Sequence, residues 1–116
     1  MIEFHLPTLP PSKNALRQRT RNGIARTPAY NAWLTEFGWE MKRQHVRKVS
    51  GPYKLTMNAQ RPDKRRRDLA NLLESVSDAL HTHKVTDDDA FAEMIVMRWV
   101  TTGTGVTIRV EPAGVE

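Results

Sequence analysis

A dense run of basic side chains and a cluster of carboxylates lie close together in the middle of this sequence. The basic side chains are those of Arg61, Lys64, Arg65, Arg66 and Arg67, and such a run suits contacts with phosphate groups. Asp68 follows directly, and three adjacent aspartates stand at 87–89. Carboxylates are the ligands that Mg²⁺ prefers, and phosphodiester hydrolysis can use two such ions. The combination indicates a nuclease that acts on DNA or RNA.

Asp68 has two possible roles at the start of a predicted helix. Its carboxylate could cap the helix by accepting backbone N–H bonds, and spacing alone favours this interpretation. It could also hold a metal ion, because one oxygen can cap while the other binds the ion.

The aspartates Asp87, Asp88 and Asp89 repel one another unless a cation lies among them. A solvated acidic loop or a helix cap would also explain them. In a basic chain, beside an arginine run, they favour a metal site instead.

A second basic segment precedes the first by some forty residues. It contains Lys13, Arg17, Arg19, Arg21 and Arg26 and no acid. A solvated loop would be the ordinary interpretation, but the second basic cluster favours a role in DNA contact. The net charge of +5 and the pI near 10.0 also suit a polyanionic partner.

Composition excludes several other classes of protein. The 116 residues are enough for one domain. The chain has no cysteine, so disulfides and thiolate metal sites are excluded. No window approaches the ~18 apolar residues of a membrane span, and the N-terminus is unlike a signal peptide. We therefore expect a soluble protein of the cytoplasm.

Apolar spacing predicts the elements of the first half of the chain. Residues 2–6 alternate as in a half-buried strand, and residues 12–26 are predicted to form a loop. Thr27 and Pro28 are typical of a helix start, and a turn at residues 50–52 is predicted to close that helix, with Lys42, Arg43, Arg47 and Lys48 in its last turns. Its helically spaced stripe indicates a face packed in the core, formed by Tyr30, Trp33, Leu34, Phe37 and Met41.

The second half predicts a strand at 53–59 and a second helix over 69–80. Residues 91–100 are apolar enough for a strand buried on much of both faces. A glycine turn at 101–105 leads to a last strand at 106–110, antiparallel to the one before. The order β-α-β-α-β-β predicts one α/β (α+β) domain over residues 1–116, with two helices packed on a small mixed sheet.

These residues resemble the RusA-type Holliday junction resolvases, which are small phage-associated endonucleases. The most specific match is Pro62–Leu69, where the family has a PD-(K/R)-RRRDLDN signature. It continues through Asn71-Leu72, Asp78-Ala79-Leu80 and Asp88-Asp89. The segment Pro10–Asn14 is similar to the family's PPSxN segment. Length and element order also agree, so the resemblance covers nearly the whole chain.

The resemblance implies a homodimer that binds four-way DNA junctions and makes paired nicks with Mg²⁺ or Mn²⁺ during recombination and repair. It places Asp68 and Asp89 on catalytic, metal-holding acids of the family, with Asp88 beside them. The expected DNA-binding residues are Lys13, Asn14, Arg17, Arg19, Arg21, Lys64, Arg65, Arg66 and Arg67. No membrane or small-molecule substrate is expected, and the setting would be a bacterial or phage-infected cell.

The sequence departs from the family signature at two positions. Ala70 stands where the family has a catalytic Asp, and Glu74 stands where a lysine is common. Losing a metal-holding carboxylate should weaken cleavage more than junction binding. Ala70 could be an engineered inactivation, a natural variant offset by Asp87 or Glu74, or the mark of a relative that binds DNA without cutting it. A shared metal site would also require the acidic loop to fold back to Asp68, within one chain or across a dimer.

Overall fold

A mixed four-stranded sheet forms one layer of the computed structural model, which describes residues 1–61 and 68–113 and, within them, all side chains except that of Asp89. The strands lie in the order β1 (Ile2–Leu6), β6 (Val106–Pro112), β4 (Tyr53–Gln60) and β5 (Ala92–Val100). β4 pairs antiparallel with β6 and parallel with β5. β5 and β6 therefore run in opposite directions, as predicted, but β4 lies between them.

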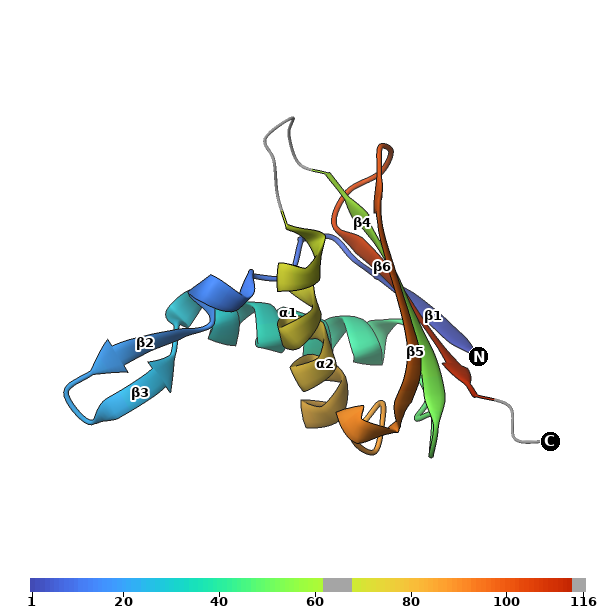
Figure 1. Ribbon diagram of the computed structural model, residues 1–116, viewed down its shortest axis with the longest axis horizontal. Coiled ribbons are helices and arrows are strands. Elements are labelled where there is room, and N and C mark those ends of the chain that lie inside the picture. Colours follow the sequence, from blue (N-terminus) through green and yellow to red (C-terminus); the bar gives the residue numbers. More distant parts are fainter. Residues whose placement is uncertain (62–67, 114–116) are drawn as a thin grey trace.

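Two helices lie on the same side of this sheet, α1 (Pro28–Arg43) and α2 (Leu73–Thr82), the second preceded by the 3-10 turn η2 (Leu69–Leu72) (Figure 1). The parallel β4–α2–β5 unit explains why α2 runs antiparallel to both strands. The predicted fold class, an α+β domain with two helices on a mixed sheet, is confirmed. None of the described helices is long and apolar enough to cross a membrane.

α1 begins where the sequence predicts and ends earlier. The Thr27 hydroxyl oxygen accepts the Tyr30 N–H at 3.2 Å, which is the expected N-terminal cap. The predicted end near residue 50 is wrong. The helix stops at Arg43 because His45 adopts a left-handed φ of +55° and the chain turns to bury Val49, which forms a bridge with Thr86. Arg47 and Lys48 consequently lie beyond the helix.

The core lies between the helices and one face of the sheet. The predicted aromatic stripe of α1 is buried, as is every second residue of β4, which are Tyr53, Leu55, Met57 and Ala59. The alternate residues of β4 are only half-buried and face the opposite side of the sheet, which no described helix covers (Figure 1). This face is polar on β4, where it carries Lys54, Thr56, Asn58 and Gln60.

β5 differs from its prediction. A strand buried on both faces was expected, yet β5 forms an edge of the sheet, and Met94 and Ile95 are 54% and 41% exposed. Burial against the described residues does not explain its apolar composition. An exposed apolar edge strand usually pairs with another strand.

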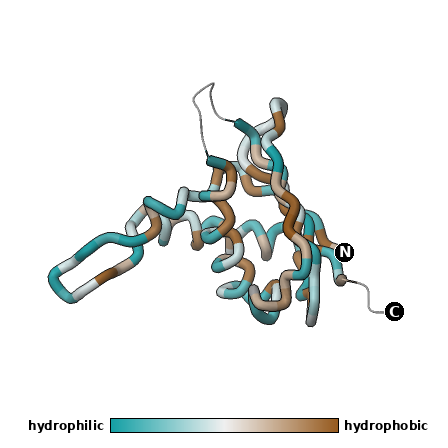
Figure 2. The backbone as a smooth tube through the Cα atoms, in the orientation of Figure 1, coloured by the Kyte–Doolittle hydropathy of each residue, from teal (hydrophilic) through white to brown (hydrophobic). Residues whose placement is uncertain are grey.

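Residues 12–26 are not a loop, contrary to the prediction. They form the 3-10 turn η1 (Lys13–Ala15) and a two-stranded hairpin of β2 (Arg17–Thr20) and β3 (Gly23–Arg26). The hairpin projects from the body of the molecule, and its trace is mostly hydrophilic (Figures 1 and 2). All eight strand residues are exposed, so no face is buried and no alternation of apolar residues marks the strands in the sequence.

Gly105 should tolerate no side chain. Its φ is +68°, and an added Cβ would lie 1.9 Å from the backbone oxygen of Leu6. We expect Gly105→Ala to lower the free energy of unfolding by about 2 kcal/mol or more, through backbone strain and the clash. Urea denaturation measures it. Gly103→Ala is the matched control, because Gly103 has a φ of +87° but open space around it, and an equal loss in both variants would contradict the role of the clash.

Candidate functional site

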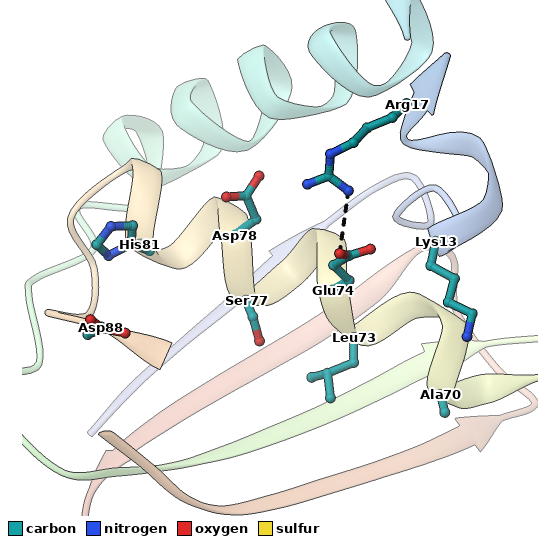
Figure 3. Close-up of a pocket in the computed structure, with 9 residues that line it drawn as sticks. All are labelled: Lys13, Arg17, Ala70, Leu73, Glu74, Ser77, Asp78, His81 and Asp88. Atoms are coloured by element: carbon teal, nitrogen blue, oxygen red, sulfur yellow. Dashed lines mark hydrogen bonds and ion pairs between the residues drawn. The ribbon is translucent and has the colours of Figure 1, made fainter. Parts of the chain in front are cut away.

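A groove of about 600 Å³ runs along the exposed face of α2 (Figure 3). The helical segment contributes side chains at helical spacing, from Ala70 and Glu74 to Asp78 and His81. Lys13 and Arg17 from η1 and β2 line the groove near its Ala70 end, and Asp88 lies at the opposite end. The groove therefore joins basic residues from the N-terminal segment to a carboxylate that follows α2.

Asp68 caps the helical segment, as the spacing favoured. Its Oδ1 accepts the Ala70 N–H at 3.2 Å, and its side chain is exposed. Asp68 does not line the groove. It lines a neighbouring hollow of about 370 Å³, together with Asn71 and Trp99. The cap uses one carboxylate oxygen, so the second remains geometrically available for a cation.

Asp88 lies beyond the other end of α2. Its Oδ1 accepts the Ala90 N–H at 3.0 Å and so starts the 3-10 turn η3 (Asp89–Phe91) that leads into β5. Residues 69–82 separate it from Asp68, and at helical rise these span roughly 20 Å. Within one chain the acidic loop thus does not fold back to Asp68. Among the described side chains, no three His, Asp or Glu are grouped to hold a metal ion.

The basic residues of the N-terminal segment divide into two groups. Arg17 and Arg26, at the root of the hairpin, form ion pairs with Glu74 and Asp78 of α2, both at 3.4 Å. Lys13 lines the groove. The other predicted DNA-binding residues of the segment are exposed, namely Asn14, Arg19 and Arg21. Lys64, Arg65, Arg66 and Arg67 lie outside the described residues.

Asp78 also receives a hydrogen bond from the Tyr30 hydroxyl. Burial and the Asp78 carboxylate raise the pKa of Tyr30, so the phenol stays protonated and donates. Asp78 therefore links α1, α2 and the root of the hairpin. The sequence marked Asp78 only as part of the family motif, and no local signal connects it with Tyr30, 48 residues away.

Asp87 is held away from the groove. Its Oδ1 pairs with the Lys48 ammonium at 2.5 Å, and its Oδ2 accepts the Gly51 N–H at 2.9 Å. The hydrogen bond from Lys48, followed by that from Gly51, lowers the pKa of the Asp87 carboxyl. Asp87 thus connects the loop after α2 to the segment before β4. Its role among the three adjacent aspartates is to stabilise the fold.

This contact predicts a pH-dependent contribution to stability. A lowered folded-state pKa adds stability above the unfolded pKa, about 3.9 for Asp, and that stability is lost as the pH falls through the lower folded value. We expect the thermal midpoint of Asp87→Asn to fall below that of the parent at pH 6 and to approach it near pH 2. Lys48→Met should behave alike, since it removes the same contact. A midpoint difference that is constant with pH would contradict the role of this charge.

Comparison with protein families matched the chain to the endodeoxyribonuclease RusA family over residues 7–111. Comparison with curated proteins gave no match. The matched range contains the hairpin, both ends of α2 and all of β5. It therefore covers every element that lines the groove.

Proposed function

The chain belongs to the RusA endodeoxyribonuclease family, whose members act on Holliday junctions, and we propose that it is a homodimeric, divalent-metal-dependent endonuclease that nicks four-way DNA junctions. The observation that carries the proposal is the family match over nearly the whole chain. The exposed acids at both ends of α2 and the basic hairpin beside them support it. The proposed catalytic and metal-holding residues are Asp68, Asp88 and Asp89.

The separation of these acids argues that each site draws on two chains. Asp68 and Asp88 lie at opposite ends of α2 and cannot share an ion within one chain. A two-fold axis beside α2 would place the start of the helix in one protomer near the acidic loop of its partner. We propose this arrangement because it uses every acid that the family motif marks.

The free edge of β5 suits such an interface. No described strand pairs with one side of its backbone, and Phe91, Met94 and Ile95 near its start are 42%, 54% and 41% exposed. If two β5 edges pair antiparallel, the Ala92 end of one strand lies beside the Val100 end of the other. Asp68 shares a hollow with Trp99, near the Val100 end, and Asp88 precedes the Ala92 end. The pairing therefore brings Asp68 towards the acidic loop of the partner.

A charge on this edge tests the interface. We expect Met94→Lys to shift the protein from dimer to monomer, because like charges would face each other across the two-fold axis beside apolar side chains. Sedimentation equilibrium measures the change. Trp39→Lys, which alters an exposed apolar residue of α1 that is 67% exposed, is the matched control and should leave the dimer intact. A Met94→Lys protein that remains dimeric would exclude the β5 interface.

The donor set fits a hard divalent cation. Carboxylate oxygens from Asp68 and from the 88–89 pair are the ligands that Mg²⁺ and Mn²⁺ accept, with water completing the shell. When bound, such an ion polarises the phosphodiester and activates water for attack. The part of this chain is to orient the carboxylates of Asp68 and Asp88, each of which accepts a backbone N–H bond at a helical start. Lys13 and Arg17 at one end of the groove, together with the basic hairpin, would hold the DNA backbone.

Glu74 is the acid best placed to offset the alanine at position 70. The two residues stand four positions apart, and both line the groove. Asp87, the other acid raised from the sequence, is held by Lys48 and Gly51 and does not line the groove. The Glu74 side chain is half exposed, and its carboxylate pairs with the Arg17 guanidinium at 3.4 Å. If a DNA phosphate binds Arg17 instead, the Glu74 carboxylate is released from this weak surface ion pair.

Cleavage of a synthetic four-way junction tests the proposed function. With Mg²⁺ we expect paired nicks on the junction, none on a linear duplex of the same sequence, and no product in EDTA. A preference for the linear duplex, or cleavage that persists in EDTA, would contradict the proposal.

The second candidate is a junction-binding protein of the same fold that does not cut DNA. Ala70 favours it, because the family's second carboxylate is missing there. It predicts tight junction binding in a gel shift without nicks in Mg²⁺ or Mn²⁺. A protein with neither junction preference nor cleavage would exclude both candidates.

A further inference from the structure

The hairpin of β2 and β3 carries one large apolar side chain with no role in the fold. Ile24 is 73% exposed, the highest value among the exposed large hydrophobic residues that the structure describes. It is one residue pair from the turn, opposite Arg19. The eight strand residues of the hairpin are all exposed. Ile24 is therefore free to enter a partner.

The root of the hairpin is fixed to the body while the tip projects. Leu16 is fully buried, and its carbonyl accepts the Thr27 N–H at 2.9 Å. The Thr27 hydroxyl donates to the Ala15 carbonyl at 2.7 Å. The ion pairs of Arg17 and Arg26 with α2 add two further contacts. A hairpin held in this way presents its tip in a defined direction, which lowers the entropic cost of binding.

One face of the hairpin combines this apolar residue with positive charge. Cross-strand partners share a face, so Arg17 with Arg26 and Arg19 with Ile24 lie on the same side. Arg21 in the turn adds charge, and the segment from Arg17 to Arg26 contains no acid. Among the described residues no acid forms an ion pair with Arg19 or Arg21. A second copy of this chain, with a net charge of +5, is a poor partner for such a face, whereas nucleic acid is a good one.

We propose that Ile24 is a wedge that inserts between base pairs at the branch point of the DNA while Arg19 and Arg21 hold the flanking phosphates. Apolar wedges beside basic residues open base steps in this way in other DNA-binding proteins. Unstacking costs least where stacking is already interrupted, as it is at a branch. The wedge would thus make the hairpin bind branched DNA in preference to linear duplex. The inference rests on the proposed function only in taking branched DNA as the ligand.

Fluorescence of 2-aminopurine placed at the branch point of a four-way junction tests the wedge. The fluorophore brightens when it unstacks, so saturating the junction with the parent protein should raise its signal. Ile24→Ala should remove most of the rise and weaken junction binding by roughly 10-fold, while linear-duplex binding changes little. Ile24→Met should retain the rise, because it keeps an apolar side chain. The fluorescence is measured in Ca²⁺ or EDTA, so that the result reports DNA binding and does not depend on cleavage.

Arg19→Ala is the matched control on the same face. It should weaken junction and duplex binding alike and reduce the salt slope by ~0.9, yet leave the fluorescence rise at saturation. An unchanged rise with Ile24→Ala on a junction that still binds would overturn the wedge and leave the proposed function standing. A parent protein that does not bind junctions would overturn both. Equal thermal midpoints of parent and Ile24→Ala exclude a folding defect.

Discussion

Mixing two inactive variants is expected to restore cleavage that neither has alone. One variant carries Asp68→Asn, and the other carries Asp88→Asn with Asp89→Asn. Each alone should lose roughly 1,000-fold in cleavage rate, because a metal ion supplies several kcal/mol of transition-state stabilisation. Asn retains the capping bond at position 68, so the fold should survive. In a mixed dimer with shared sites, both defects fall in one site and the other is intact.

In an equal mixture whose subunits exchange freely, about half of the dimers are mixed, and each mixed dimer has one intact site of two. About a quarter of all sites should therefore be intact. Those dimers should nick one strand of a junction and fail to resolve it. Mixing two preparations of Asp68→Asn is the control. If the acids act within one chain, every site in the mixed dimer keeps a defect and cleavage stays absent, which would exclude the shared site. Where the parent cleaves too slowly, both variants are made with Ala70→Asp.

Restoring the acid at position 70 is the second large effect. We expect Ala70→Asp to raise the rate of junction cleavage by about 100-fold and to increase the apparent Mg²⁺ affinity by 10-fold or more. These magnitudes are typical of adding or removing one well-placed group at a metal site or beside a transition state. Position 70 lies next to Asp68 and on the groove face with Glu74. Without metal, the added charge should lower the thermal midpoint by repulsion, and Mg²⁺ should reverse the loss.

Ala70→Asn is the matched control, because it adds similar volume without charge, and it should gain neither cleavage nor metal affinity. Glu74→Gln separates the remaining possibilities. If Glu74 offsets the missing acid, Glu74→Gln should lower cleavage in the parent by roughly 10-fold or more and have less effect beside Ala70→Asp. Cleavage by neither the parent nor Ala70→Asp would leave the non-catalytic binding function as the one supported.

The sequence predicted correctly the elements that bury a face. The stripe of α1 and the alternation of β4 record the spacing of side chains that face the core, so their periods are visible without coordinates. The hairpin of β2 and β3 was missed because nothing in it is buried. The edge position of β5 was missed because apolar composition reports that a strand is covered, and the cover here is proposed to come from a second chain.

The sequence by itself indicated the residues that are proposed to carry the chemistry, since Asp68, Asp88 and the basic segments are local motifs of the family. It also determined that Asp68 can cap a helix, because capping needs only the next few residues. The tertiary structure alone decided where those residues lie: Asp87 on Lys48, Glu74 beside Ala70, and the acids at opposite ends of α2. The reason is physical, because such distances depend on how a parallel crossover directs the helix between β4 and β5, and no local spacing encodes that.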